Sequence, residues 1–317
     1  MDKAEQFIPV QRDYLIKNTI LNFDLYGQKG SEYHLIRRSF LPIIDRVFQD
    51  IEDKTDGKVF IRIDSLNDYH TYLEENLDVL LNITSVSQIE KAGILFKIGS
   101  NIAEKAYAKP NDIDILKRCK EVVENMISYF RSGSDAFMQF EAAVPVDYEL
   151  HTHCLNVAAL SLQLAIESGI ENNSQLTDLG LGALLHDVGM TIVPNKIRTK
   201  TGPLTDREYM MVKKHVLWGY NILKETGFLS EEALMPVLEH HERIDGRGYP
   251  SRKIGDDLHT FGKIVAIAVV FDAMNTNRSY KNAVTSFPAL KEMLAMDGAF
   301  DPQLIKTFIK MMGRPQK

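Results

Sequence analysis

The sequence is poor in several features that would restrict its class. It has only two cysteines and one tryptophan in 317 residues. Because Cys119 and Cys154 cannot build a disulfide framework, they indicate a reducing compartment. The longest apolar run, residues 264–271, is much shorter than a membrane span. The start of the sequence also lacks the apolar segment of a secretory signal. Together these features predict a cytoplasmic protein.

An excess of basic charge is also lacking. The chain carries 37 Lys and Arg residues against 43 Asp and Glu residues, which gives a net charge of −6. This balance offers no broad positive field, so neither a nucleic acid polymer nor a membrane is expected as a partner. An anionic substrate would need local neutralisation by metal ions or by a few Lys and Arg side chains. With 44% hydrophobic and 25% charged residues, the composition is that of a globular protein long enough for two domains.

Residues 1–84 are predicted to form a small α+β domain. The strand-like segments are residues 7–10, 19–26, 33–36 and 58–63. Residues 27–30, Gly-Gln-Lys-Gly, supply a turn between the second and third of these segments. Two helices are predicted at residues 42–49 and 67–81. This part of the sequence holds no constellation of catalytic residue types.

Residues 85–317 are predicted to be almost entirely helical. Residues 85–145 hold two connector helices, 89–106 and 113–130, with apolar residues at three- and four-residue spacing. Further helices are predicted at 147–168, 176–187, 205–215 and beyond, 231–241, 258–274, 289–296 and 302–312. Thr205 and Glu208 form a capping-box pattern, and Ser230 is placed to cap the helix that ends at His240. The predicted fold class is mainly α, a small N-terminal α+β domain joined to an all-helical bundle.

Histidine is uncommon in proteins, yet seven of the nine histidines lie between Glu149 and Asp272. Five of them follow one another along the predicted helices: His153, His186, His215, His240 and His241. Glu149 and His153 are four residues apart, so they project from the same helix face. Neutral imidazole is a common ligand of zinc, iron and manganese. Five imidazoles and Asp187, a natural bridging ligand, are enough to hold two metal ions. The pattern predicts a metal-dependent hydrolase.

A single histidine carries little information, because most are surface groups or hydrogen-bonded structural groups. We assign that structural role to the four histidines that fit no ligand position: His34, His70, His151 and His259. A structural role for the other five would require buried imidazoles to satisfy one another without a metal, at a high desolvation cost. The joint pattern therefore favours a metal centre.

Several short motifs follow one another around these histidines. Residues 184–189 are Leu-Leu-His-Asp-Val-Gly, and residues 240–250 are His-His-Glu-Arg-Ile-Asp-Gly-Arg-Gly-Tyr-Pro. With Gly-Pro-Leu-Thr at 202–205, residues 271–281 and Phe-Asp-Pro at 300–302, residues 146–308 resemble an HD-GYP domain. Phe-Asp-Pro at 300–302 fits the cap of that family's last helix. This branch of the HD phosphohydrolase superfamily hydrolyses cyclic di-GMP. The resemblance implies an HD-type helical bundle and a phosphodiesterase of bacterial second-messenger signalling. It also implies that residues 1–84, which lie outside the match, are a regulatory or sensory domain.

The resemblance implies roles for individual residues. It implies two or three divalent ions, iron or manganese, with these ligands: Glu149, His153, His186, Asp187, His215, His240 and His241. Within this set His186 and Asp187 are the catalytic pair, and Glu149 serves a third metal. The implied substrate contacts are Gly248, Tyr249, Pro250, Arg278 and Lys281. The implied small-molecule partner is cyclic di-GMP, and the implied protein partners are diguanylate cyclases or other signalling proteins. Whether the chain forms a homodimer is left open.

Two positions depart from the family pattern. Met190 replaces a lysine three residues after the HD aspartate, and Val269 replaces a metal-binding aspartate in an ungapped alignment. Since valine cannot bind a metal, one ion loses an anionic ligand unless Glu149 or Asp272 compensates. Three interpretations stay open. In the first, the chain is an active phosphodiesterase. In the second, it is a degenerate domain that binds cyclic di-GMP or partner proteins without hydrolysis. The third, a phosphohydrolase acting on another nucleotide, is disfavoured by the Gly-Tyr-Pro segment.

Overall fold

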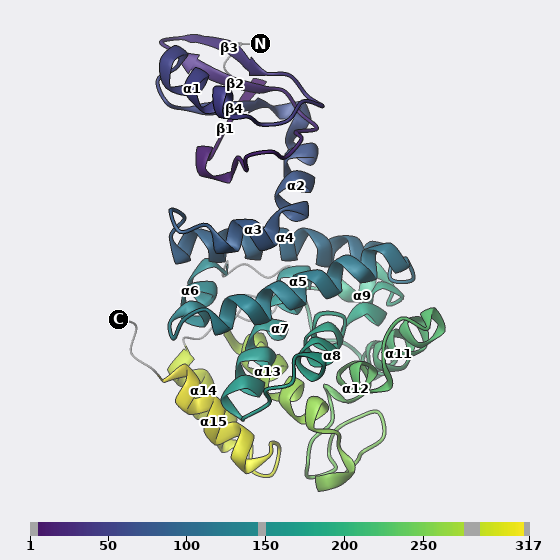
Figure 1. The fold of residues 1–317 in the computed structure, drawn as a ribbon. Coiled ribbons are helices and arrows are strands. Elements are labelled where there is room, and N and C mark those ends of the chain that lie inside the picture. Colours follow the sequence, from purple (N-terminus) through teal and green to yellow (C-terminus); the bar gives the residue numbers. More distant parts are fainter. Residues whose placement is uncertain (1–5, 145–149, 276–285, 314–317) are drawn as a thin grey trace. The chain divides into compact units, whose positions relative to one another are not determined.

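The computed structural model describes residues 6–144, 150–275 and 286–313 (Figure 1). Contacts between Cα atoms divide the chain into two compact units, Met1–Ile94 and Leu95–Lys317. The division falls within α4 (Gln88–Ala108), one of the predicted connector helices. The boundary between domains 1–84 and 85–317 stays a prediction. No helix of the described residues is long and apolar enough to cross a membrane.

The first unit contains a four-stranded antiparallel sheet with the strand order β1-β4-β2-β3. The strands are β1 (Phe7–Val10), β2 (Leu25–Lys29), β3 (Glu32–Arg37) and β4 (Val59–Arg62). The turn predicted at 27–30 is wrong, because Gly27 lies inside β2 and pairs with both His34 and Val59. The turn between β2 and β3 is formed by Gly30, in the left-handed region at φ 59°, and Ser31. The strand predicted at 19–26 begins too early, because β2 starts only at Leu25.

Three helices complete the α+β unit: α1 (Asp45–Lys54), α2 (Leu66–Glu75) and α3 (Leu77–Asn82), with the 3-10 turns η2 (Arg12–Tyr14) and η3 (Ile63–Ser65). The single helix predicted at 67–81 is wrong, because it is interrupted at Asn76. The amide of Asn76 donates to the carbonyl of Tyr72 at 2.8 Å, the local side-chain bond that competes with helix continuation. Phe23 and Ile61 are fully buried in the core of this unit.

The second unit is helical, as predicted. It contains the rest of α4 and then α5 (Ile113–Arg131), α6 (Ala136–Ala143), α7 (Leu150–Glu167), α8 (Asn173–Leu184), η4 (Val188–Thr191), α9 (Asn195–Arg198), α10 (Asp206–Lys213), α11 (His215–Thr226), α12 (Glu231–Glu239), η5 (Gly255–Asp257), α13 (Thr260–Asn275), α14 (Ser286–Ala295) and α15 (Pro302–Met312). The predicted caps are confirmed. The Thr205–Glu208 capping box opens α10, Ser230 caps α12, and Asp301 caps α15.

Helix α7 is central to the helical unit. All residues from Thr152 to Ala165 are buried, including the polar ones, as expected for a helix that is surrounded by others. It packs against α8, α13 and α15. Three elements that carry candidate ligands therefore meet at one place: α7, the turn after α8, and α13.

The segment around His215 differs from the prediction. A continuous helix through this residue was expected, but α10 ends at Lys213 and α11 begins at His215. Gly189 explains how α11 is placed, because a Cβ at this position would lie 1.9 Å from the carbonyl oxygen of His215. Only glycine permits this approach. The break and the contact bring His215 beside Asp187.

Candidate metal centre

Four helices converge on one cluster of imidazoles and a carboxylate. His153 lies on α7, His186 and Asp187 follow α8, and the remaining members begin α11 or follow α12: His215, His240 and His241. Their donor atoms form two groups, in each of which all atoms lie within 4.8 Å of one another. One group is Asp187, His215, His240 and His241, and the other is His153, His186 and Asp187. Asp187 belongs to both.

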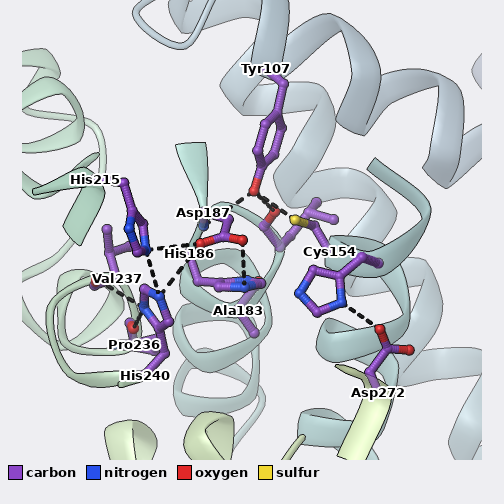
Figure 2. A network of polar contacts seen from close by, with 12 residues as sticks. Tyr107, Cys154, Ala183, His186, Asp187, His215, Pro236, Val237, His240 and Asp272 are labelled. Atoms are coloured by element: carbon purple, nitrogen blue, oxygen red, sulfur yellow. Dashed lines mark hydrogen bonds and ion pairs between the residues drawn. The ribbon is translucent and has the colours of Figure 1, made fainter. Parts of the chain in front are cut away.

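Asp187 lies between the imidazoles (Figure 2). Its Oδ1 is 3.0 Å from Nε2 of His215 and 3.5 Å from Nε2 of His240. Its Oδ2 is 3.7 Å from Nε2 of His186. The two carboxylate oxygens thus face different histidines. This is the arrangement that allows one carboxylate to bridge two ions.

The backbone fixes the tautomer of three imidazoles. Nδ1 of His186 donates to the carbonyl of Ala183 at 2.7 Å, and Nδ1 of His215 donates to that of Val212 at 2.6 Å. Nδ1 of His240 donates to the carbonyl of Pro236 at 3.0 Å. With the proton on Nδ1, each Nε2 presents a lone pair to the cluster.

The lone pairs need a cation. The Nε2 atoms of His215 and His240 are 3.1 Å apart, and with both protons on Nδ1 neither can donate to the other. Nε2 of His186 is buried and has no hydrogen-bond partner among the described residues. A metal ion would satisfy these atoms, so the residues present fit a metal centre.

The electrostatics of the cluster favour metal-binding protonation states at Asp187 and at three of the histidines, His186, His240 and His241. Burial lowers the pKa of His186, His240 and His241, which keeps these imidazoles neutral. Burial acts against ionisation of Asp187, but the facing His186 and His215 outweigh it, so its pKa is well below the usual range. Burial likewise opposes protonation of His215, but Asp187 outweighs it and raises the pKa of that imidazole. The Asp187 anion and the neutral His186, His240 and His241 are the forms that bind divalent ions, whereas an ion bound at His215 would displace the proton that Asp187 favours there.

Asp272 lies behind His153. On α13, its Oδ2 is hydrogen-bonded to Nδ1 of His153, and its Oδ1 accepts from the amide of Asn156. Asp272 is completely buried. A carboxylate on the far ring nitrogen of a histidine orients the ring and raises its basicity as a ligand. The sequence offered Asp272 as a replacement ligand for the missing aspartate, whereas the structure places it on the far nitrogen of a candidate ligand.

The cluster opens into a cavity of about 490 Å³. The cavity wall includes His153, Asp187, His215 and His241 from the cluster, with Tyr249, Met190, Val269, Arg198 and Lys200. Both departures from the family pattern, Met190 and Val269, therefore face this space. A larger cavity of about 640 Å³ shares Gly202 and Leu204 with it but contains no member of the cluster.

The Gly-Tyr-Pro segment contributes one side chain to this cavity. The ring of Tyr249 stacks on His241 with centroids 4.6 Å apart, and the Tyr249 N–H donates to the His241 carbonyl at 3.1 Å. Gly248 is buried, and Pro250 follows a cis peptide bond. Of these three predicted contacts, Tyr249 alone lines the cavity.

The other predicted residues are either outside the described residues or outside both donor groups. Glu149, Arg278 and Lys281 are outside the described residues. Of the histidines assigned structural roles, none belongs to either donor group within the described parts of the chain. His259 illustrates this, since its Nδ1 accepts the N–H of Phe261 at 3.2 Å near the start of α13.

Two supporting residues were not predicted from the sequence. Tyr107, buried on α4, accepts the backbone N–H of Asp187 at 3.2 Å and lies 2.8 Å from Sγ of Cys154. Glu242 accepts the N–H groups of Ser251 and Arg252 through Oε1, at 2.6 and 2.9 Å. Glu242 follows the histidine pair directly, so its place in the motif was a usable signal. Nothing near Tyr107 in the sequence points to the cluster.

Comparison with known proteins agrees with this geometry. The HD domain family matches residues 114–304, which is more than half of the chain. The cyclic di-GMP phosphodiesterase PA4108 of Pseudomonas aeruginosa is 34% identical over 164 residues, 51% of this chain and 40% of that protein. The 3'3'-cGAMP-specific phosphodiesterase 2 of Vibrio cholerae is 33% identical over 204 residues, 62% of this chain and 36% of that protein. The chain therefore spans less than half the length of these relatives.

One solved structure resembles the whole chain. Bd1817, a HDG"Y"P protein from Bdellovibrio bacteriovorus, matches with a TM-score of 0.70 and 22% identity. The match covers 97% of this chain and 100% of that one, and it shows a shared fold. The family match, the named relatives and the motifs agree. The chain belongs to the HD domain family.

Proposed function

We propose that this chain is a metal-dependent phosphodiesterase that hydrolyses cyclic di-GMP in second-messenger signalling. The observation that carries the proposal is the position of Asp187 in both donor groups of one buried cluster. Relatives named as cyclic di-GMP and 3'3'-cGAMP phosphodiesterases support a cyclic dinucleotide as the substrate. We also propose that residues 1–84 regulate the helical domain.

Two ions, iron or manganese, would be held by the two donor groups. Asp187, His215, His240 and His241 would hold one, and His153, His186 and Asp187 the other. Glu149 is proposed as a ligand of a third ion. Bound ions of this kind lower the pKa of a coordinated water and neutralise phosphoryl oxygens.

Three features of the cavity suit a phosphodiester: oriented imidazoles, an aromatic ring and positive charge. The carbonyls of Ala183, Val212 and Pro236 hold three imidazoles in one tautomer, so the ligand atoms are oriented before substrate arrives. Tyr249 places an aromatic ring at the cavity wall, where it can contact a nucleobase. Lys200 and Arg198 give the same wall positive charge. Arg278 and Lys281 are proposed as further phosphate contacts.

Turnover is the test of this function. Protein purified without oxygen and loaded with manganese or iron should convert cyclic di-GMP to the linear dinucleotide or to GMP, as detected by chromatography. Metal content is measured in parallel by mass spectrometry. Asp187→Asn, which removes the shared anionic ligand, should abolish turnover and reduce bound metal. Protein that holds metal but converts no cyclic di-GMP with either ion would contradict the proposal.

A further inference from the structure

The cavity lacks a positive charge at position 190. Met190 follows Asp187 by three residues and lines the cavity together with Val269. The thioether of Met190 and the isopropyl group of Val269 carry no charge, so neither can bind a phosphoryl oxygen electrostatically. Each phosphate of a cyclic dinucleotide carries a negative charge, which a cation elsewhere in the cavity wall can bind in place of one at position 190.

Two cationic side chains of the described residues line this cavity, Arg198 and Lys200. Lys200 already has a strong partner, because its Nζ lies 2.6 Å from Oε2 of Glu208. Glu208 also accepts the Thr205 N–H at 2.7 Å in the capping box of α10. These contacts with Lys200 and Thr205 lower the pKa of Glu208 to about 2. Glu208 therefore stays ionised at neutral pH, and Lys200 ties the segment before α10 to that helix.

Arg198 has no such partner. It is exposed at the end of α9, and its Nη2 lies 3.4 Å from the neutral Oδ1 of Asn195. Within the described residues, no carboxylate forms an ion pair with it. A guanidinium presents two parallel N–H groups that match two oxygens of a phosphate, and it stays charged at every relevant pH.

We propose that Arg198 is a substrate-binding residue whose guanidinium binds a phosphate of the cyclic dinucleotide, supplying the cation that position 190 lacks. The identity of the ligand rests on the proposed function. Two observations do not depend on that function: Arg198 lines the cavity, and no carboxylate of the described residues pairs with it.

Binding without turnover tests this assignment. Calorimetry measures the affinity of the metal-free protein for cyclic di-GMP in the presence of a chelator. Arg198→Gln should weaken binding about tenfold, which corresponds to about 1.4 kcal/mol. Arg198→Lys, which keeps the charge but loses the paired N–H groups, should lose less. Introducing Met190→Lys into Arg198→Gln should restore part of the affinity.

Lys196→Gln is the matched control, because Lys196 lies on the same short helix, is exposed and does not line the cavity. It should bind cyclic di-GMP like the wild type. Equal affinities of the wild type and both variants for cyclic di-GMP would overturn the assignment. An equal loss of affinity in Arg198→Gln and Lys196→Gln would also overturn it. With manganese-loaded protein, Arg198→Gln should raise KM more than it lowers kcat.

The outcomes separate this inference from the proposed function. Loss of binding in Arg198→Gln, in a protein that never hydrolyses cyclic di-GMP, supports the role of Arg198 and contradicts the enzymatic proposal. Normal hydrolysis and binding by Arg198→Gln leaves the enzymatic proposal intact and removes the role of Arg198. A wild-type protein that neither binds nor hydrolyses cyclic di-GMP overturns both.

Discussion

Asp272 of α13 is hydrogen-bonded to Nδ1 of His153 on α7, on the ring nitrogen opposite the one available to a metal. The carboxylate thereby fixes the orientation of this imidazole, and Asn156 fixes the carboxylate in turn. All three side chains are buried. The donor group of His153, His186 and Asp187 thus depends on a residue that need not touch the ion.

Asp272→Asn should weaken metal binding by a factor of about 10 to 100, the usual effect of losing a carboxylate behind a histidine ligand. The asparagine side chain can still accept the Nδ1 proton, but it carries no charge to strengthen the imidazole as a ligand. Competition titration with a metal-sensitive dye measures the change. Asp297→Asn, at an exposed carboxylate, is the control. Unchanged affinity in Asp272→Asn would mean that the orientation of His153 does not limit metal binding.

Val269→Asp should increase the affinity for divalent ions. Val269 lines the cavity beside the cluster and is 6% exposed, so an aspartate there can reach an ion bound by the cluster. The same change should destabilise the metal-free protein by about 1–3 kcal/mol, because it buries a carboxylate without a partner. Thermal unfolding with and without manganese measures both effects.

Val269→Asn separates charge from size in that experiment. It has nearly the same shape as Val269→Asp but adds no anionic ligand, so manganese should stabilise it no more than the wild type. A tenfold gain in affinity adds about 1.4 kcal/mol of stabilisation at saturating metal. An equal metal-induced shift in all three proteins would show that position 269 does not reach the ion.

Glu242→Ala should lower the free energy of unfolding by about 2 kcal/mol, because two backbone N–H groups lose a charged acceptor. These donors, Ser251 and Arg252, directly follow the Gly-Tyr-Pro segment. Glu242→Gln keeps an acceptor oxygen at the same position and should lose less. Denaturant unfolding of the two variants makes the comparison. Equal losses in both would show that the negative charge, and not the acceptor geometry, holds the loop.

The parts of this protein that local sequence determines were predictable. Helical periodicity and the caps Thr205, Ser230 and Asp301 fix the main helices, because each cap bonds within its own first turn. The ligand candidates were also recognisable, since their motifs are local. The contact of Asp272 with His153 was not, because it joins residues 119 positions apart and depends on how α7 meets α13.

Two of the wrong predictions, at His215 and at Gly27, also concern places where residues far apart in the sequence are in contact. The break before His215 stands beside the close approach of Gly189 to the His215 carbonyl, a contact that helix propensity does not report. Gly27 was assigned to a turn because its neighbours permit one, but pairing with two strands keeps it in the sheet. Tertiary contacts override local preference at both places.

Glu141 should make the stability of the metal-free protein fall as pH rises. Its Oε1 is buried and has no hydrogen-bond partner in the described parts of the chain. Burial, with a smaller contribution from Asp272, raises the pKa of Glu141 from 4.5 to about 8. Between these two values the folded chain keeps a proton that the unfolded chain releases. The contribution of Glu141 to the free energy of unfolding is therefore fully present below pH 4.5, and it is lost as pH rises towards about 8.

Glu141→Gln should remove this contribution. The wild type should lose on the order of 1 kcal/mol per pH unit between pH 5 and 8 relative to the variant, since one retained proton corresponds to about 1.4 kcal/mol per unit. Denaturant unfolding at several pH values in a chelator gives the two slopes. Glu104→Gln, at an exposed glutamate of α4, is the control and should keep the slope of the wild type. Parallel curves for wild type and Glu141→Gln would show that Glu141 ionises normally in the folded protein.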